Sequence, residues 1–119
     1  MKRKHCAVLR LVLKKPWYDM IASGEKREEY RDATRYWTRR IRNVAKKAME
    51  LIGGKGKLPV VIAFSCGYTK ADMFFECDGI TRHFEYSVRC TSPRMAWGEP
   101  DTSHYVIKLG ERVELEDEP

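Results

Sequence analysis

The strongest constraint on the fold of this chain is that helical patterns end near residue 53, whereas strand patterns fill the rest of the sequence. Beyond Gly53-Gly54, apolar and alternating runs are separated by short segments rich in turn-forming residues. Strands joined in this way form a curled antiparallel sheet or a small barrel. With about six expected strands, two expected helices and 119 residues, the chain is predicted to fold as one α+β domain.

Hydrophobic periodicity places the strands. Residues 6–13 carry Leu9, Leu11 and Leu13 at a period of two, so these side chains share one face of a strand. Residues 59–66 form a continuous apolar run, which is typical of a buried strand. Further strands are expected over residues 26–31, 73–77, 84–90, 104–109 and 112–115, with a hairpin turn at Asp78-Gly79 and a loop over 91–103.

The first helix is expected between Pro16 and Gly24. Proline is tolerated in the first turn because its missing N–H would have no helical partner there. Trp17, Met20 and Ile21 are spaced i, i+3 and i+4, so we expect them to face the core. Gly24 is expected to end the helix in a left-handed conformation.

The second helix is expected to run from the N-cap Asp32 to about Ile52. Its apolar face consists of Trp37, Ile41, Val44, Ala45, Ala48 and Ile52. A basic stripe at i, i+4, i+7 and i+11 consists of Arg35, Arg39, Arg42 and Lys46. Because neighbouring cations repel one another by roughly a few tenths of a kcal/mol, the stripe is either a solvated face or a surface that faces a polyanion.

The charge is distributed unevenly along the chain. Residues 1–57 contain 17 Lys and Arg against 6 Asp and Glu, whereas residues 58–119 contain 6 against 11. The net charge of +6 therefore conceals a strongly positive first half. Such polarity indicates a positive surface for a polyanionic partner such as RNA.

No apolar run approaches the ~18 residues that a membrane span needs, and the run over residues 6–13 has no cleavage site for export. We therefore expect a cytoplasmic protein without a membrane partner. The four cysteines, Cys6, Cys66, Cys77 and Cys90, form no Cys-x-x-Cys pair and match no zinc module. We interpret them as buried free thiols and expect neither a metal nor a cofactor.

The segment from Ser23 to Arg31 combines alternating charges with a glycine and a tyrosine directly after an apolar stretch. It contains the pattern Gly-x-Lys-x-x-Glu-x-Arg, formed by Gly24, Lys26, Glu29 and Arg31. This pattern resembles the signature of the ASCH domain, a small β-barrel module related to the PUA RNA-binding domains. The order of elements is also similar to that family, with a preceding strand, a helix that begins Pro-Trp-Tyr-Asp-Met-Ile and a closing strand over 105–110.

The resemblance implies a single ASCH domain over residues 1–119, built as a small PUA-like barrel of about six strands with two flanking helices. It also implies a cleft between barrel and helices, lined by Lys26 and Arg31 and suited to nucleic acid or a nucleotide. We therefore expect a protein that binds RNA or a nucleotide in a basic cleft. RNA is expected to lie across the basic stripe of the second helix, with a nucleotide in the cleft near Lys26 and Arg31.

One branch of the family hydrolyses the amide of acetylated cytidine with the signature lysine, a threonine three residues later and a distant glutamate. Lys26 matches, but Glu29 stands where the threonine would be, so the hydroxyl nucleophile is missing. The alternative function is a hydrolase of a modified nucleoside or RNA, with Lys26 and Glu29 as catalytic residues. The two side chains converge only if the strand begins after Lys26 or bulges; otherwise they form surface ion pairs.

Aromatic residues interleave with the basic ones and offer stacking surfaces for bases. Tyr68 and Trp97 lie in expected loops and are stacking candidates, whereas Trp37 is expected in the core. His104 begins a strand in polar surroundings, where it is either structural or lines a site, and His83 carries no signal. A protein-interaction domain is a third possibility, suggested by the acidic end and the charge polarity, and the sequence leaves the oligomeric state open.

Overall fold

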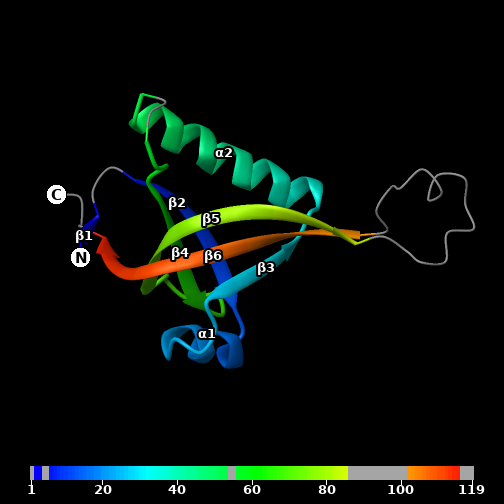
Figure 1. The fold of residues 1–119 in the computed structure, drawn as a ribbon. Coiled ribbons are helices and arrows are strands. Elements are labelled where there is room, and N and C mark those ends of the chain that lie inside the picture. Colours follow the sequence, from blue (N-terminus) through cyan, green and yellow to red (C-terminus); the bar gives the residue numbers. More distant parts are fainter. Residues whose placement is uncertain (1, 4–5, 54–55, 86–101, 116–119) are drawn as a thin grey trace, which may run out of the picture.

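The computed structural model describes residues 2–3, 6–53, 56–85 and 102–115 (Figure 1). Most of the predicted strand over 84–90 and loop over 91–103 lies outside the described residues, as do Trp97 and Cys90. In chain order the elements are β1 (Lys2–Arg3), β2 (Ala7–Leu13), α1 (Lys15–Ala22), β3 (Glu28–Asp32), α2 (Arg35–Leu51), β4 (Val60–Cys66), β5 (Met73–Glu85) and β6 (Thr102–Leu115).

Strands β2 to β6 form one curled sheet in the order β2-β4-β5-β6-β3 (Figure 1). The pair β2 and β4 is parallel, and the other neighbours are antiparallel. The two-residue β1 adds a short parallel pairing to the end of β6. The predicted α+β class is therefore confirmed, and the sheet is a half-barrel. It is mixed rather than wholly antiparallel, because the chain passes through β3 and α2 before β4 returns beside β2.

Strand β5 is continuous over 13 residues, so the hairpin turn predicted at Asp78-Gly79 is wrong. The register of β5 against β6 shifts between Phe75 and Cys77 and again between Cys77 and Gly79. These shifts are bulges that allow the turn-forming pair to remain within the strand. Bulges bend a strand and increase its twist, which helps to curl the sheet. Strand β6 is likewise one strand of 14 residues instead of the two that were predicted.

The core is built from alternate residues of the sheet and one residue of α1. Leu9, Leu11 and Leu13 are at most 4% exposed, which confirms their predicted common face. The core cluster consists of Leu9, Leu11, Leu13, Ile21, Ile62, Phe64, Met73, Cys77, Ile107 and Leu109. Trp37, Ile41 and Val44 on the predicted apolar face of α2 pack against this cluster while half-buried.

Helix α1 begins with proline in its first turn and ends at a glycine, as predicted. Gly24 has φ of +84° and donates its N–H to the Ile21 carbonyl, which is the left-handed helix ending that glycine permits without strain. Only part of the predicted inner face is buried. Ile21 is 1% exposed, whereas Trp17 is 50% exposed, so its predicted inward position is wrong.

Helix α2 begins two residues later than predicted, because Asp32 belongs to β3 and pairs with His104 of β6. The N-cap is Thr34, whose side-chain oxygen accepts the Trp37 N–H at 3.2 Å. The helix then crosses one side of the curled sheet, while α1 lies at its end (Figure 1). Neither described helix combines the length and the apolar character that a membrane span requires.

Candidate functional site

The half-barrel is open between β2 and β3, which are the two ends of the strand order. A cleft of about 650 Å³ lies at this opening, with α1 and α2 contributing to its walls. Its cationic side chains are Arg10, Lys14, Lys26, Arg31 and Arg40. Its rings are Trp17, Tyr30, Tyr36, Trp37 and Tyr68. Glu29 is the single carboxylate among the described lining residues, so the cleft is strongly positive.

Two arginines bridge the open side of the barrel. The Leu13 carbonyl accepts the Gly67 N–H beyond the end of β4, so the alternate carbonyls of Arg10 and Val12 face the opening. Arg31 of β3 donates to the Val12 carbonyl at 3.1 Å, and Arg40 of α2 donates to the Arg10 carbonyl at 2.9 Å. Side chains thus satisfy backbone acceptors that a further strand would satisfy in a closed barrel.

Glu29 organises the base of the cleft. Glu29 is 6% exposed, and its Oε1 accepts a hydrogen bond from the Tyr30 N–H at 2.9 Å. The same oxygen lies 3.4 Å from Arg31 Nη1 and 3.9 Å from Lys26 Nζ. Because β3 begins at Glu28, Lys26 precedes the strand and is free to turn toward Glu29. Lys26 and Glu29 can therefore converge, because the strand begins after Lys26.

Lys26 presents its ammonium group to the cleft. Its side chain is 14% exposed, and its Nζ lies 4.6 Å from the Tyr30 ring centre and 5.9 Å from that of Trp17. The 3.9 Å separation from Glu29 is too long for a hydrogen bond, and no described residue accepts one from this ammonium. Its N–H groups are therefore available to a ligand.

The rings of the cleft are held by cations and partly open to solvent. Trp37 lies between two guanidinium groups, with Arg31 Cζ at 5.3 Å and Arg40 Cζ at 4.8 Å from its centre. Tyr36 meets Trp37 edge-on at 5.1 Å and accepts a hydrogen bond from Arg40. Tyr36 is 62% exposed and Tyr68 is fully exposed. Such rings can receive another flat group.

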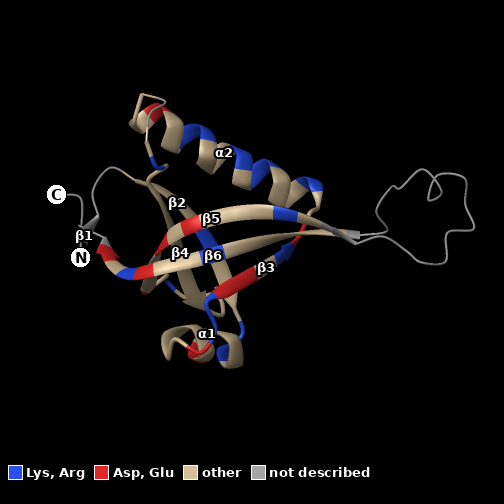
Figure 2. Ribbon diagram, viewed as in Figure 1, with Lys and Arg blue, Asp and Glu red and all other residues tan. Residues whose placement is uncertain are grey.

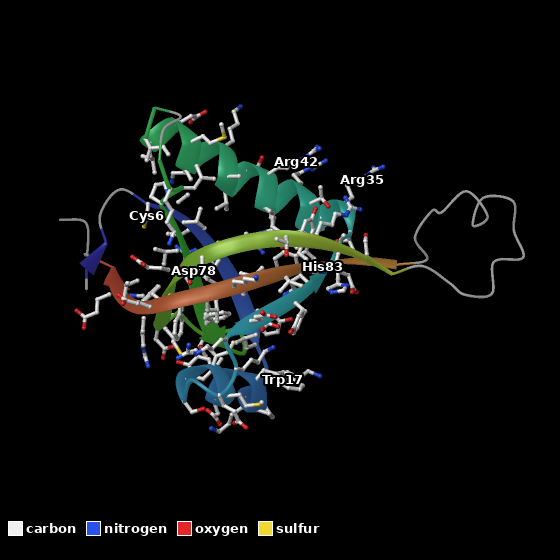
Figure 3. The ribbon with its side chains drawn as sticks, in the orientation of Figure 1. Cys6, Trp17, Arg35, Arg42, Asp78 and His83 are labelled. Atoms are coloured by element: carbon white, nitrogen blue, oxygen red, sulfur yellow. The ribbon has the colours of Figure 1, made fainter. Side chains whose placement is uncertain are left out.

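The predicted residues divide into two sets. Lys26, Glu29, Arg31 and Tyr68 converge on the cleft, as does Trp37, which was expected to serve the core alone. The basic stripe does not line the cleft: its members lie along the outer surface of α2, where Figure 2 shows a row of cations and Figure 3 shows the first and third pointing away from the sheet. These stripe residues are Arg35, Arg39, Arg42 and Lys46.

Sequence reasoning missed half of the cleft. Arg10 and Lys14 come from β2 and the turn after it, and Trp17 was assigned to the core. Tyr36 and Arg40 are spaced i, i+4 on α2, which places an aromatic and a cationic side chain on one side of the helix. That spacing was the signal for the side of α2 that lines the cleft. Trp97, the remaining candidate, lies outside the described residues.

The described lining residues of the cleft offer cations, rings, tyrosine hydroxyls and one carboxylate. The hydroxyls among its described lining residues all belong to tyrosines. Tyr30 donates to Glu28 at 3.0 Å, and this hydrogen bond raises the pKa of Tyr30, which disfavours its use as a nucleophile. Within the described part of the chain no three His, Cys, Asp or Glu side chains cluster as metal ligands. Cys66 and Cys77 are free thiols there, and burial raises the pKa of Cys77.

No protein-family model, no curated protein and no solved structure matches this chain. Its function is therefore inferred from the geometry of the cleft.

Proposed function

We propose that this protein binds RNA or a nucleotide in the cleft between β2, β3 and the helices, as an ASCH-type domain with a PUA-like barrel. The observation that carries the proposal is the combination of five cations and five rings around one carboxylate. The curled half-barrel and the convergence of Lys26, Glu29 and Arg31 support the assignment to that family.

The cations of the cleft have different roles in phosphate binding. Arg31 and Arg40 are already engaged with backbone carbonyls and rings, so they shape the wall of the cleft. Lys26 has N–H groups to donate, and a phosphate oxygen is a strong acceptor for an ammonium group. Arg10 and Lys14 are exposed at the rim, where they attract a polyanion before it docks.

The exposed rings supply the second half of nucleotide recognition. Trp17, Tyr36 and Tyr68 are at least 50% exposed although each lines the cleft. Base stacking on such rings is worth ~1–3 kcal/mol for each base and tolerates any sequence. A ligand with both a phosphate and a flat base therefore fits the cleft better than a peptide of Asp and Glu, whose side chains have no ring to stack.

The second candidate function is hydrolysis of a modified nucleoside or RNA. It is favoured by one observation, the ammonium of Lys26 beside the carboxylate of Glu29 in a cleft, both with little exposure. Against it, Glu29 Oε1 already accepts the Tyr30 N–H and pairs with Arg31. A hydrolase would also need water as its nucleophile, since the described lining residues offer no serine or threonine.

The test compares Lys26→Met with Lys46→Met, which remove the same charge from inside and outside the cleft. Binding of a fluorescent uridine hexanucleotide is followed by anisotropy between about 50 and 200 mM NaCl. Lys26→Met should weaken binding about tenfold or more, because a hydrogen bond to a charged group contributes ~1.5–3 kcal/mol. It should also lower the slope of log affinity against log salt by about 0.7, the value for one phosphate on a single strand.

Lys46→Met should leave affinity within about twofold, because its charge is separated from the cleft and screened by salt. A flat salt response of the wild type, or equal losses in the two variants, would contradict the proposal. Incubation with acetylated cytidine and with mixed RNA decides the second candidate. Product that forms with the wild type and not with Lys26→Met would establish a hydrolase.

A further inference from the structure

Three aromatic side chains continue from the cleft across the face of the sheet opposite to buried Glu29. Tyr30 of β3 lies edge-on to His104 of β6 at 6.1 Å between ring centres. His104 stacks on His83 of β5 at 5.6 Å, with 16° between the ring planes. We call these three residues the ring strip. Because they come from three adjacent hydrogen-bonded strands, their spacing is set by the sheet.

The ring strip is continuous with the proposed binding cleft. Tyr30 lines the cleft, and its ring centre lies 4.6 Å from Lys26 Nζ. Tyr30 and His83 are exposed, and His104 is half-buried. The Thr81 hydroxyl and Nε2 of His83 share a 3.0 Å hydrogen bond, which orients the His83 ring. Figure 3 marks His83 where β5 runs beside the other strands of this face. A ligand that leaves the cleft past Lys26 therefore meets the strip next.

A second cavity of about 540 Å³ adjoins the cleft on this side. It shares Tyr30, Arg31 and Trp37 with the cleft and ends at His104. Among its described lining residues, the positive charge of Arg31 is offset by the carboxylate of Asp32, so they lack the positive excess of the cleft. The chemistry of the two spaces differs accordingly: the cleft suits a phosphate, whereas the second cavity suits a neutral base with hydrogen-bonding edges.

We infer that the ligand is a single-stranded oligonucleotide of at least two nucleotides, with one nucleotide in the cleft and the base of the next on the ring strip. The inference rests on the proposed function and names its substrate class. Stacking on the strip is tolerant of sequence because every base presents a flat face. The ring spacing is set by paired strands, so the strip is ordered before the ligand arrives.

The experiment measures affinity as a function of ligand length. Wild type is titrated with uridine monophosphate and with uridine di-, tri- and hexanucleotides, by nuclear magnetic resonance for the weak ligands and by anisotropy for the longer ones. We expect affinity to rise from the mononucleotide to the dinucleotide or trinucleotide. His83→Ala should weaken hexanucleotide binding about fivefold, the lower end for loss of one stacking ring, and leave mononucleotide binding unchanged.

His104→Ala provides a second variant, and Met49→Ala, exposed on α2 away from both cavities, is the matched control. Thermal melting identifies any variant that fails to fold. Mononucleotide binding without a gain in affinity with length, or a His83→Ala variant equal to Met49→Ala, would overturn the inference and leave the proposed function standing. Absence of binding to every nucleotide, or equal binding of poly-glutamate, would overturn both.

Discussion

Arg39 and Arg40 are neighbours on α2 that offer a direct test of how the open side of the barrel is held. Arg40 donates to the Arg10 carbonyl of β2 at 2.9 Å and lies over the rings of Tyr36 and Trp37 at 5.6 and 4.8 Å. Arg39 is exposed and makes no hydrogen bond, ion pair or ring contact with the described residues. Replacing either by alanine removes one charge from the same helix and changes helix propensity equally.

We expect Arg40→Ala to lower the free energy of unfolding by about 1–3 kcal/mol. A hydrogen bond from a charged donor contributes ~1.5–3 kcal/mol and a cation–π contact at an exposed site ~0.5–1 kcal/mol. The sum is reduced here because Arg40 is half-buried and water can reach the vacated carbonyl. Arg39→Ala should stay within about 0.5 kcal/mol of wild type. In melting temperature, the Arg40 loss corresponds to roughly 4–12 °C.

Urea unfolding followed by circular dichroism measures both variants, and an unchanged m value shows that the same surface is exposed. Arg40→Lys keeps the charge but not the planar fork that both stacks and donates. It should therefore recover only a minor part of the loss. If Arg39→Ala and Arg40→Ala shifted the midpoint equally, or if Arg40→Lys were as stable as wild type, the bridging role of Arg40 would be refuted.

Two further predictions concern the regions around α1. The hydrogen bond that Tyr18 donates to Asp72 raises the pKa of Tyr18 from 10.0 to about 12. Since the folded pKa is the higher one, the stabilisation is complete below pH 10 and is lost as pH rises toward 12. Because the pKa of Tyr30 is raised as well, tyrosinate absorbance should show a late-titrating component that shrinks by one tyrosine in Tyr18→Phe. Gly24→Ala should lower the free energy of unfolding by about 1–2 kcal/mol, because φ is +84° there while no atom lies within 4 Å of an added Cβ. Ala22→Gly, at the last residue of α1, is the control, and an unchanged urea midpoint in Gly24→Ala would contradict this reading.

Local patterns were sufficient for the elements whose environment is set by their own residues. The alternation of Leu9, Leu11 and Leu13 predicts the buried face of β2, because one side of a strand must meet the core. Gly24 predicts the end of α1 for the same local reason. The convergence of Lys26 and Glu29 was conditional on where β3 begins, and pairing with β6 starts that strand at Glu28.

The errors arose where tertiary pairing overrides a local preference. Asp78-Gly79 is a sequence that favours a turn. In the structure it lies inside β5, because the long pairing of β5 with β6 continues past it with a bulge. Asp32 and Thr34 are both good N-cap residues. Asp32 pairs in β3, so Thr34 caps α2. For α2, the sequence shows which residues lie on the same side of the helix. It does not show which of the basic residues face β2 and which face solvent. Arg40 therefore faces the cleft, while the stripe beginning at Arg35 faces solvent.

The bridging of β2 by arginines has a consequence for solubility. An uncovered strand edge is a template on which another molecule can add a strand, and such pairing leads to aggregation. Here two of the outward carbonyls of β2, those of Arg10 and Val12, accept hydrogen bonds from Arg40 and Arg31. Both donors carry a charge that disfavours the approach of a second positively charged chain. The groups that shape the cleft thus also protect the edge of the sheet. A change of Arg31 or Arg40 to suit a different ligand would therefore also uncover part of the β2 edge.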